Sequence, residues 1–127
     1  MKIKSLAIYS GLLLVLMAFL TIFVNPLIGY YGYFRTDLPF NMIHFLSGVL
    51  LIIVALEFGP RISAALRTLG IFYIILAVLG AITTGFDDYG TMFSFMAVSG
   101  PLHLLHLLIG VTLLIFGTRS IRMDARV

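Results

Sequence analysis

The sequence contains no cysteine and no tryptophan, and only 10% of its 127 residues are charged. The lack of cysteine excludes disulfides, thiolate metal sites and a cysteine nucleophile. A soluble domain carries about a quarter charged residues, so the shortage of charge argues against that class of protein. Without tryptophan, an aromatic belt at a membrane interface has to be built from tyrosine and phenylalanine.

Long apolar runs take the place of the missing charges. Four of them come close to the roughly 20 residues that a helix needs to cross a bilayer, and they cover residues 5–24, 39–58, 64–85 and 101–117. Only Glu57 and Arg67 are charged within them, and both lie near an end. The sequence therefore predicts an all-α membrane protein, a four-helix transmembrane bundle that forms a single domain over residues 1–127.

Turn and cap residues mark the expected helix ends. Asn25 precedes a proline and is expected to end the first helix, because the residue before proline is driven out of the α region. Asp37, Ser63 and Ser99 stand at the starts of the other three helices, where their oxygens are expected to cap free backbone N–H groups. The connection over residues 86–98 is expected to hold a short interfacial turn.

Basic residues are shared unevenly among the connections. Seven of the eight fall in the N-terminus, the middle connection or the C-terminal tail: Lys2, Lys4, Arg61, Arg67, Arg119, Arg122 and Arg126. Arg35 alone stands in the other two connections, which also hold three aspartates. By the positive-inside rule, both termini and the middle connection are predicted to be cytoplasmic.

The second half of the chain repeats the first. A shift of 62 positions gives seven identities over the 17 residues 39–55. The identities include Pro39 with Pro101, His44 with His106 and Gly48 with Gly110. The repeats cover about residues 5–59 and 62–118. Because both helix pairs enter from the same side, we expect two parallel hairpins related by an axis along the membrane normal.

One face of each predicted helix is small or polar. Membrane helices pack through small residues, because lipid offers no hydrophobic drive between helices. We therefore expect these faces to meet inside the bundle. The residues expected at close helix contacts are Gly11, Ala18, Gly48, Gly80, Gly110 and Gly117.

Histidines are the candidate site residues inside the spans. His44 and His106 lie about seven residues inside their helices, roughly 10 Å below the outer surface. Asn41 and His103 lie one turn above them, so the four form one polar cluster if their helices meet at the axis. Neutral imidazoles bind haem iron, copper or zinc, and the cluster is thus a candidate cofactor site for haem b or a metal. Hydrogen bonding between helices, or a ligand or proton site, stay open as alternatives.

Signatures of other functions are missing from the sequence. It holds no P-loop, nucleophile elbow, zinc-protease or nucleic-acid motif, and no set of acid, base and nucleophile can be assembled. We therefore expect neither an enzyme nor a nucleic-acid partner. The expected partners are the lipid bilayer and other membrane-protein subunits.

Two short elements carry a resemblance to a known family. They are N-M-I-H-F-L-S-G at residues 41–48 and L-H-L-L-I-G at residues 105–110, with Gly70 and Tyr73 between them. This pattern resembles a family of small bacterial four-helix membrane proteins whose domain has no assigned function. The chain departs from it at His103, where the family element has asparagine. The resemblance implies the four-helix fold and a bacterial membrane, and it brings no activity.

Three functions remain as hypotheses. The first is a non-catalytic structural or accessory subunit of a larger complex in the bacterial cytoplasmic membrane. The second is a haem- or metal-binding electron-transfer protein that uses His44 and His106. The third is a small-solute or proton pathway. The sequence argues against it, because polar residues become fewer below Gly48 and Gly110, toward the cytoplasm.

Overall fold

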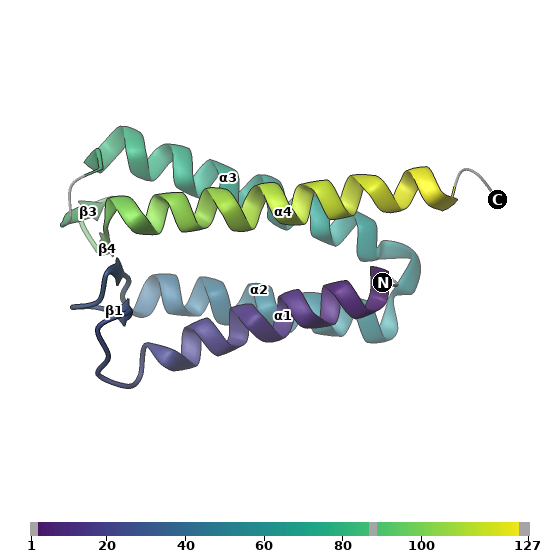
Figure 1. Ribbon diagram of the computed structural model, residues 1–127, viewed down its shortest axis with the longest axis horizontal. Helices are drawn as coiled ribbons and strands as arrows, with labels where there is room; N and C mark the ends of the chain where they lie inside the picture. The colour runs from purple at the N-terminus through teal and green to yellow at the C-terminus, as the bar shows by residue number, and fades with distance from the viewer. Residues whose placement is uncertain (1–2, 87–88, 125–127) are drawn as a thin grey trace.

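The computed structural model describes residues 3–86 and 89–124, and the side chains of these residues up to position 119. Within these ranges, four long helices form two hairpins that lie one above the other (Figure 1). The helices are α1 (Ile3–Leu20), α2 (Leu38–Glu57), α3 (Ile62–Thr84) and α4 (Gly100–Asp124). Of the predicted charged connections, Lys2, Asp87, Asp88, Arg126 and the side chain of Arg122 lie outside the described residues.

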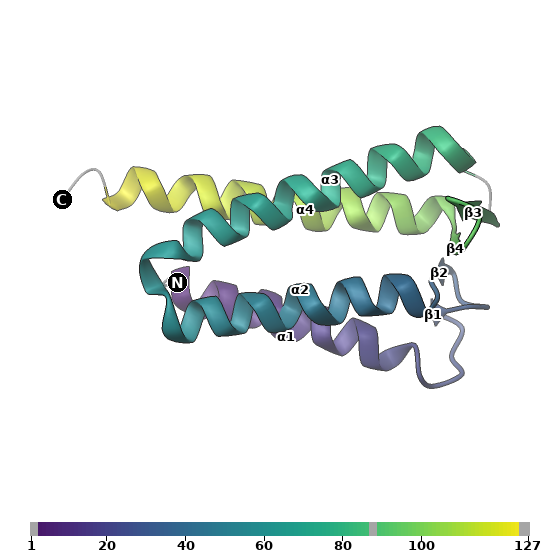
Figure 2. The same cartoon turned by 180° about the vertical axis from the view of Figure 1, so that it is seen from behind.

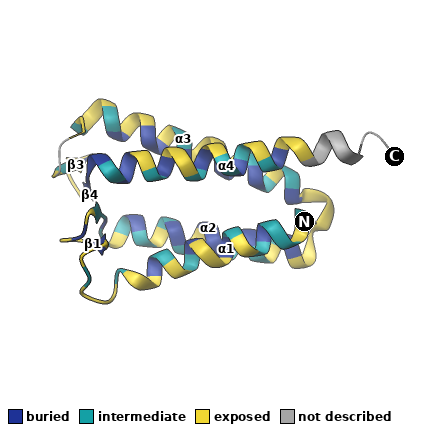
Figure 3. Ribbon diagram, viewed as in Figure 1, coloured by how far each residue is buried: buried dark blue, intermediate teal, exposed yellow. Residues whose placement is uncertain are grey.

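The four helices have the length and composition of membrane spans. Their buried residues recur every three or four positions, as on α1 with Ala7, Gly11, Leu14 and Ala18. Figure 3 shows these buried stripes alternating with exposed surface along each helix. Leucine, isoleucine and phenylalanine dominate the exposed large side chains. An exposed surface of this kind suits lipid, so the helices indicate a membrane protein.

The helix backbones lie close together within each hairpin and farther apart between the two, where buried side chains of all four helices form the core. Far more residues of α1 meet α2, and of α3 meet α4, than meet across the hairpins, which form two layers in both views (Figures 1 and 2). A Cβ on Gly48 would lie 2.5 Å from the carbonyl oxygen of Gly11, and one on Gly110 would lie 2.7 Å from that of Gly70. Near the middle of each hairpin, the two helices therefore lie with backbone directly against backbone.

Short strands build the connections at one end of the bundle (Figure 1). In the first connection, β1 (Ile28–Gly29) pairs in parallel with β2 (Phe34–Arg35). In the second, β3 (Gly90–Met92) pairs antiparallel with β4 (Met96–Val98) around a tip in which Phe93 and Ser94 have φ of 53° and 65°. The second connection thus holds a small β-hairpin, where the sequence predicts only a turn.

The first helix ends four residues earlier than predicted. The side chain of Asn25 folds back, and its Nδ2 donates to the Leu20 carbonyl at 2.9 Å. Its Oδ1 accepts from the N–H groups of Leu27 and Ile28 at 3.0 and 2.9 Å. Asn25 therefore lies beyond the end of the helix, and its side chain holds the turn that follows Leu20.

The predicted cap Ser63 has a different role. The 3-10 helix η1 (Gly59–Arg61) leads directly into α3, whose first residue is Ile62, so the prediction that Ser63 caps α3 is wrong. The Ser63 hydroxyl donates instead to the carbonyl of Gly117 on α4 at 2.5 Å. It joins the two helices of the second hairpin at the end opposite the strands.

Asp37 and Ser99 bind the connections to each other. Asp37 stands at the N-cap position of α2 but makes no capping bond to that helix; its Oδ2 accepts from the backbone N–H of Ala97 in β4 at 2.6 Å. Ser99, just before α4, accepts from the N–H of Arg35 and donates to the carbonyl of Tyr33, both at 3.1 Å. Each side chain reaches into the opposite connection, and the predicted capping bond of Asp37 is absent.

Candidate functional site

His44 of α2 and His106 of α4 meet at the seam between the hairpins. Their Nε2 atoms lie 3.1 Å apart, within hydrogen-bond distance. Both side chains are completely buried. Since helices α2 and α4 belong to different hairpins, this bond joins the two halves of the molecule inside the membrane span.

Aromatic rings pack around the pair. Tyr73 of α3 lies nearly parallel to the His44 imidazole, with ring centroids 5.9 Å apart and planes 7° apart. Its centroid lies 5.6 Å from that of His106, and Phe40 approaches His106 at 5.3 Å. The Tyr73 hydroxyl lies near Ser47 without forming a hydrogen bond of good geometry. Tyr73 was not among the predicted site residues, although it lies on the small and polar face of α3 that includes Gly80.

His103 has a partner of its own. Its Nε2 lies 2.9 Å from Oγ1 of Thr84, and the Thr84 hydroxyl donates to the carbonyl of Gly80 at 2.9 Å. Because that hydroxyl has only one proton, His103 has to donate from Nε2. Gly80 itself lies against the His103 ring, where a Cβ would overlap the imidazole. His103 therefore fastens α4 to α3 within one hairpin.

Asn41 also turns away from the histidine pair. Its Oδ1 accepts from the Thr36 hydroxyl at 3.1 Å, which ties the start of α2 to the first connection. The structure thus brings His44 and His106 together, and gives His103 and Asn41 separate partners. The single four-residue cluster expected from the sequence is divided into three hydrogen-bonded sites.

The spacing of the pair does not fit a haem iron or a bridging metal. Metal–imidazole bonds are about 2.0–2.1 Å long, so an ion held between two Nε2 atoms on opposite sides needs them roughly 4 Å apart. The observed separation of 3.1 Å is that of a direct hydrogen bond. Within residues 3–86 and 89–124, no group of three His, Asp or Glu side chains is placed to hold a metal ion.

Comparison with known proteins gives the chain a family. The model of a family described as Domain of unknown function (DUF4383) matches residues 5–119. The chain belongs to this family. The match confirms the resemblance seen in the sequence, and no curated protein and no solved structure matches the chain. The family carries no assigned function, so the functional argument rests on the geometry of this member.

The small residues of this DUF4383 protein lie at helix contacts. Gly11, Gly48 and Gly110 face the backbone of a neighbouring helix, and Gly117 lies against Arg67 and the carbonyl of Ser63. Ala18 is buried on α1. Gly70, the contact of Gly110, was not among the predicted packing residues, although the family resemblance includes it.

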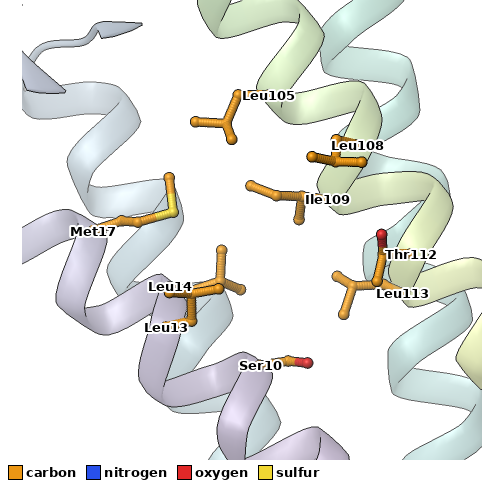
Figure 4. Close-up of a pocket in the computed structure, with 9 residues that line it drawn as sticks. All are labelled: Ser10, Leu13, Leu14, Met17, Leu105, Leu108, Ile109, Thr112 and Leu113. Atoms are coloured by element: carbon orange, nitrogen blue, oxygen red, sulfur yellow. The ribbon is translucent and has the colours of Figure 1, made fainter. Parts of the chain in front are cut away.

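An apolar groove of about 210 Å³ opens between α1 and α4 of this family member (Figure 4). Its lining residues are Ser10, Leu13, Leu14, Met17, Leu105, Leu108, Ile109, Thr112 and Leu113. Figure 4 shows Ser10 and Thr112 projecting from opposite helices toward the space between them. The groove lies between the two hairpins, and two of its lining residues, Leu13 and Leu108, are 56% and 65% exposed.

Proposed function

We propose that this DUF4383 protein is a non-catalytic structural or accessory subunit of a larger complex in the bacterial cytoplasmic membrane. The observation that carries the proposal is the open groove between α1 and α4. A transmembrane helix of a partner would place its side chains there. The polar groups of His103 and Asn41 support the same view, since they bond to their own chain and leave no open site.

Two hydroxyls inside the groove favour a helix over lipid chains. Most hydroxyls near the helix ends bond to a backbone carbonyl three or four residues back, as Thr21 does to Ala18 and Thr118 does to Leu114. Among the described residues, no side-chain hydrogen bond satisfies Ser10 or Thr112. A hydroxyl facing hydrocarbon has only the carbonyls of its own helix as partners, whereas a neighbouring helix supplies further carbonyls and small polar side chains worth about 0.6–2 kcal/mol each. The groove is therefore suited to a helix that carries such a residue.

The proposal includes a topology for the chain. Residues 1–127 form one domain of two parallel hairpin repeats, with both termini and the connection between α2 and α3 in the cytoplasm. The distribution of basic residues supports this orientation. The crossed bonds of Asp37 and Ser99, which stand 62 positions apart, support the repeat. These equivalent residues each accept a hydrogen bond from a backbone N–H of the other hairpin's connection.

The test is the composition of the complex that is purified gently from the native membrane. Native mass spectrometry should find the full chain in a fixed ratio with another integral membrane protein. Leu108→Trp fills the groove, because Leu108 lines it and is 65% exposed, and should reduce that ratio. The matched control is Leu46→Trp on α2, at the corresponding repeat position and 58% exposed, which should leave the ratio unchanged.

Two outcomes would overturn the proposal. One is a chain that runs alone, or only as a homo-oligomer, in mild detergent. The other is a visible spectrum with Soret, α and β bands that disappear in His44→Ala, which would make the protein a b-type haem carrier. On the 3.1 Å spacing of the imidazole nitrogens, we expect a flat visible spectrum in both the oxidised and the dithionite-reduced states.

A further inference from the structure

The histidine pair leaves three buried polar atoms without partners. They are Nδ1 of His44, Nδ1 of His106 and the hydroxyl of Tyr73, all on side chains with no exposed surface. Buried polar groups in folded proteins almost always have a hydrogen-bond partner, so three unpartnered atoms in one place need an explanation. We propose that the pair is a proton-transfer site, in which a proton enters at Nδ1 of one imidazole and leaves from Nδ1 of the other. This inference does not depend on a partner subunit.

The chemistry of imidazole fixes where the protons of the pair stand. A neutral imidazole has one N–H group and one bare nitrogen. In the bond between the two Nε2 atoms, one ring donates and therefore has a bare Nδ1. The other ring accepts and therefore has its proton on Nδ1. The two unpartnered ends of the pair are thus one acceptor and one donor, joined through the 3.1 Å hydrogen bond.

A single transfer then balances in atoms and charge. When His44 is the donor, a hydrated proton binds its bare Nδ1. The proton on Nε2 of His44 crosses to Nε2 of His106, and His106 releases its Nδ1 proton to water. One proton is taken up and one is released, both rings end neutral, and the hydrogen bond between them has reversed its direction. A second transfer in the same direction requires both rings to return to their first tautomers.

The groups that face the pair do not fix it in one arrangement. From α3 comes the neutral phenol of Tyr73, and from α4 comes His103, one turn above and bonded to Thr84. The titratable residues of α1 are Lys4 and Tyr9, and both are exposed. On α2 the one carboxylate is Glu57, 13 positions beyond His44, which corresponds to roughly 20 Å along a helix. Arg67 of α3 donates to the Ser63 carbonyl near Gly117, and Arg119 of α4 lies 13 positions beyond His106. Among the described residues, no charged group therefore holds the proton on one side.

The test is solid-state NMR of the full chain in lipid vesicles, with ¹⁵N-labelled histidine. The sequence has three histidines, so each signal can be assigned by substitution. For His44 and His106, we expect Nδ1 and Nε2 signals averaged between protonated and bare positions, and ring protons that exchange with water. His103 is the internal control, since its bond to Thr84 predicts one tautomer with the proton on Nε2. Fixed tautomers in the pair, or ring protons that do not exchange, would overturn the proposal.

Two variants separate proton transfer from simple exposure of the rings. His106→Gln keeps a polar group opposite His44 but cannot pass a proton on, so His44 should settle in one tautomer and exchange more slowly by an order of magnitude. His103→Asn, which places at 103 the residue found at 41, should leave the signals of the pair unchanged. Unaltered exchange of His44 in His106→Gln would contradict the inference. The measurement on the unmodified chain stands even if that variant does not fold.

Discussion

The imidazoles of His44 on α2 and His106 on α4 are hydrogen-bonded between the two hairpins, with their Nε2 atoms 3.1 Å apart. The two residues stand 62 positions apart in the chain. Side-chain packing around this bond also joins the hairpins, since Tyr73 of α3 lies against His44 and Phe40 of α2 lies against His106. Further hydrogen bonds between the hairpins lie at the strand end, where Asp37 binds Ala97. The central bond, the side chains packed around it and the crossed bonds of the connections therefore all contribute to the relative position of the two hairpins.

We expect single substitutions in the pair to be more costly than the double one. His44→Leu leaves Nε2 of His106 buried without a partner, and the free energy of unfolding should fall by about 1–3 kcal/mol. His106→Leu should do the same to His44. In the double variant both polar groups are gone, so its stability should be no lower than that of either single variant. Unfolding in mixed detergent micelles measures the stability of all three variants. A loss in the double variant equal to the sum of the two single losses would contradict a hydrogen bond between His44 and His106.

Gly80→Ala tests how His103 is held. The added Cβ would overlap the His103 ring, which cannot move aside without losing its bond to Thr84. Alanine gains about 1 kcal/mol of helix propensity over glycine, whereas overpacking costs about 1–3 kcal/mol. We expect a net loss of thermal stability, measured by near-UV circular dichroism. Gly59→Ala is the control, because no atom lies within 4 Å of its added Cβ, and it should leave stability nearly unchanged.

The sequence predicts the four helices and the meeting of His44 with His106, because apolar runs and a repeated register are properties of the chain itself. It does not predict where the polar side chains bind. Asp37 and Ser63 look like helix caps in the sequence, but the nearest unpaired groups belong to other segments, Ala97 and Gly117. His103 finds Thr84 rather than the pair, since Gly80 leaves room for its ring on that side. Such partners depend on tertiary packing that short-range rules do not include.

Asp37→Ala should loosen the connections while leaving the helices intact. The substitution removes the acceptor for the Ala97 N–H, and a hydrogen bond to a charged group contributes about 1.5–3 kcal/mol. Asp37→Asn keeps an acceptor oxygen for the Ala97 N–H and should retain most of the stabilisation that this bond provides. Hydrogen exchange by mass spectrometry should show faster exchange in residues 90–98 for the alanine variant alone. Equal protection in all three proteins would contradict a linking role for Asp37.

The absence of cysteine makes the orientation of the chain directly measurable. Tyr31→Cys places a thiol in the connection between α1 and α2, at a residue that is 85% exposed. Gly59→Cys places one in the exposed connection between α2 and α3. If both termini are cytoplasmic, a membrane-impermeant maleimide added to intact cells should label the thiol at 31. The thiol at 59 should react only after the membrane is permeabilised. The reverse pattern would place the basic connection outside, and would contradict the orientation drawn from the positive-inside rule.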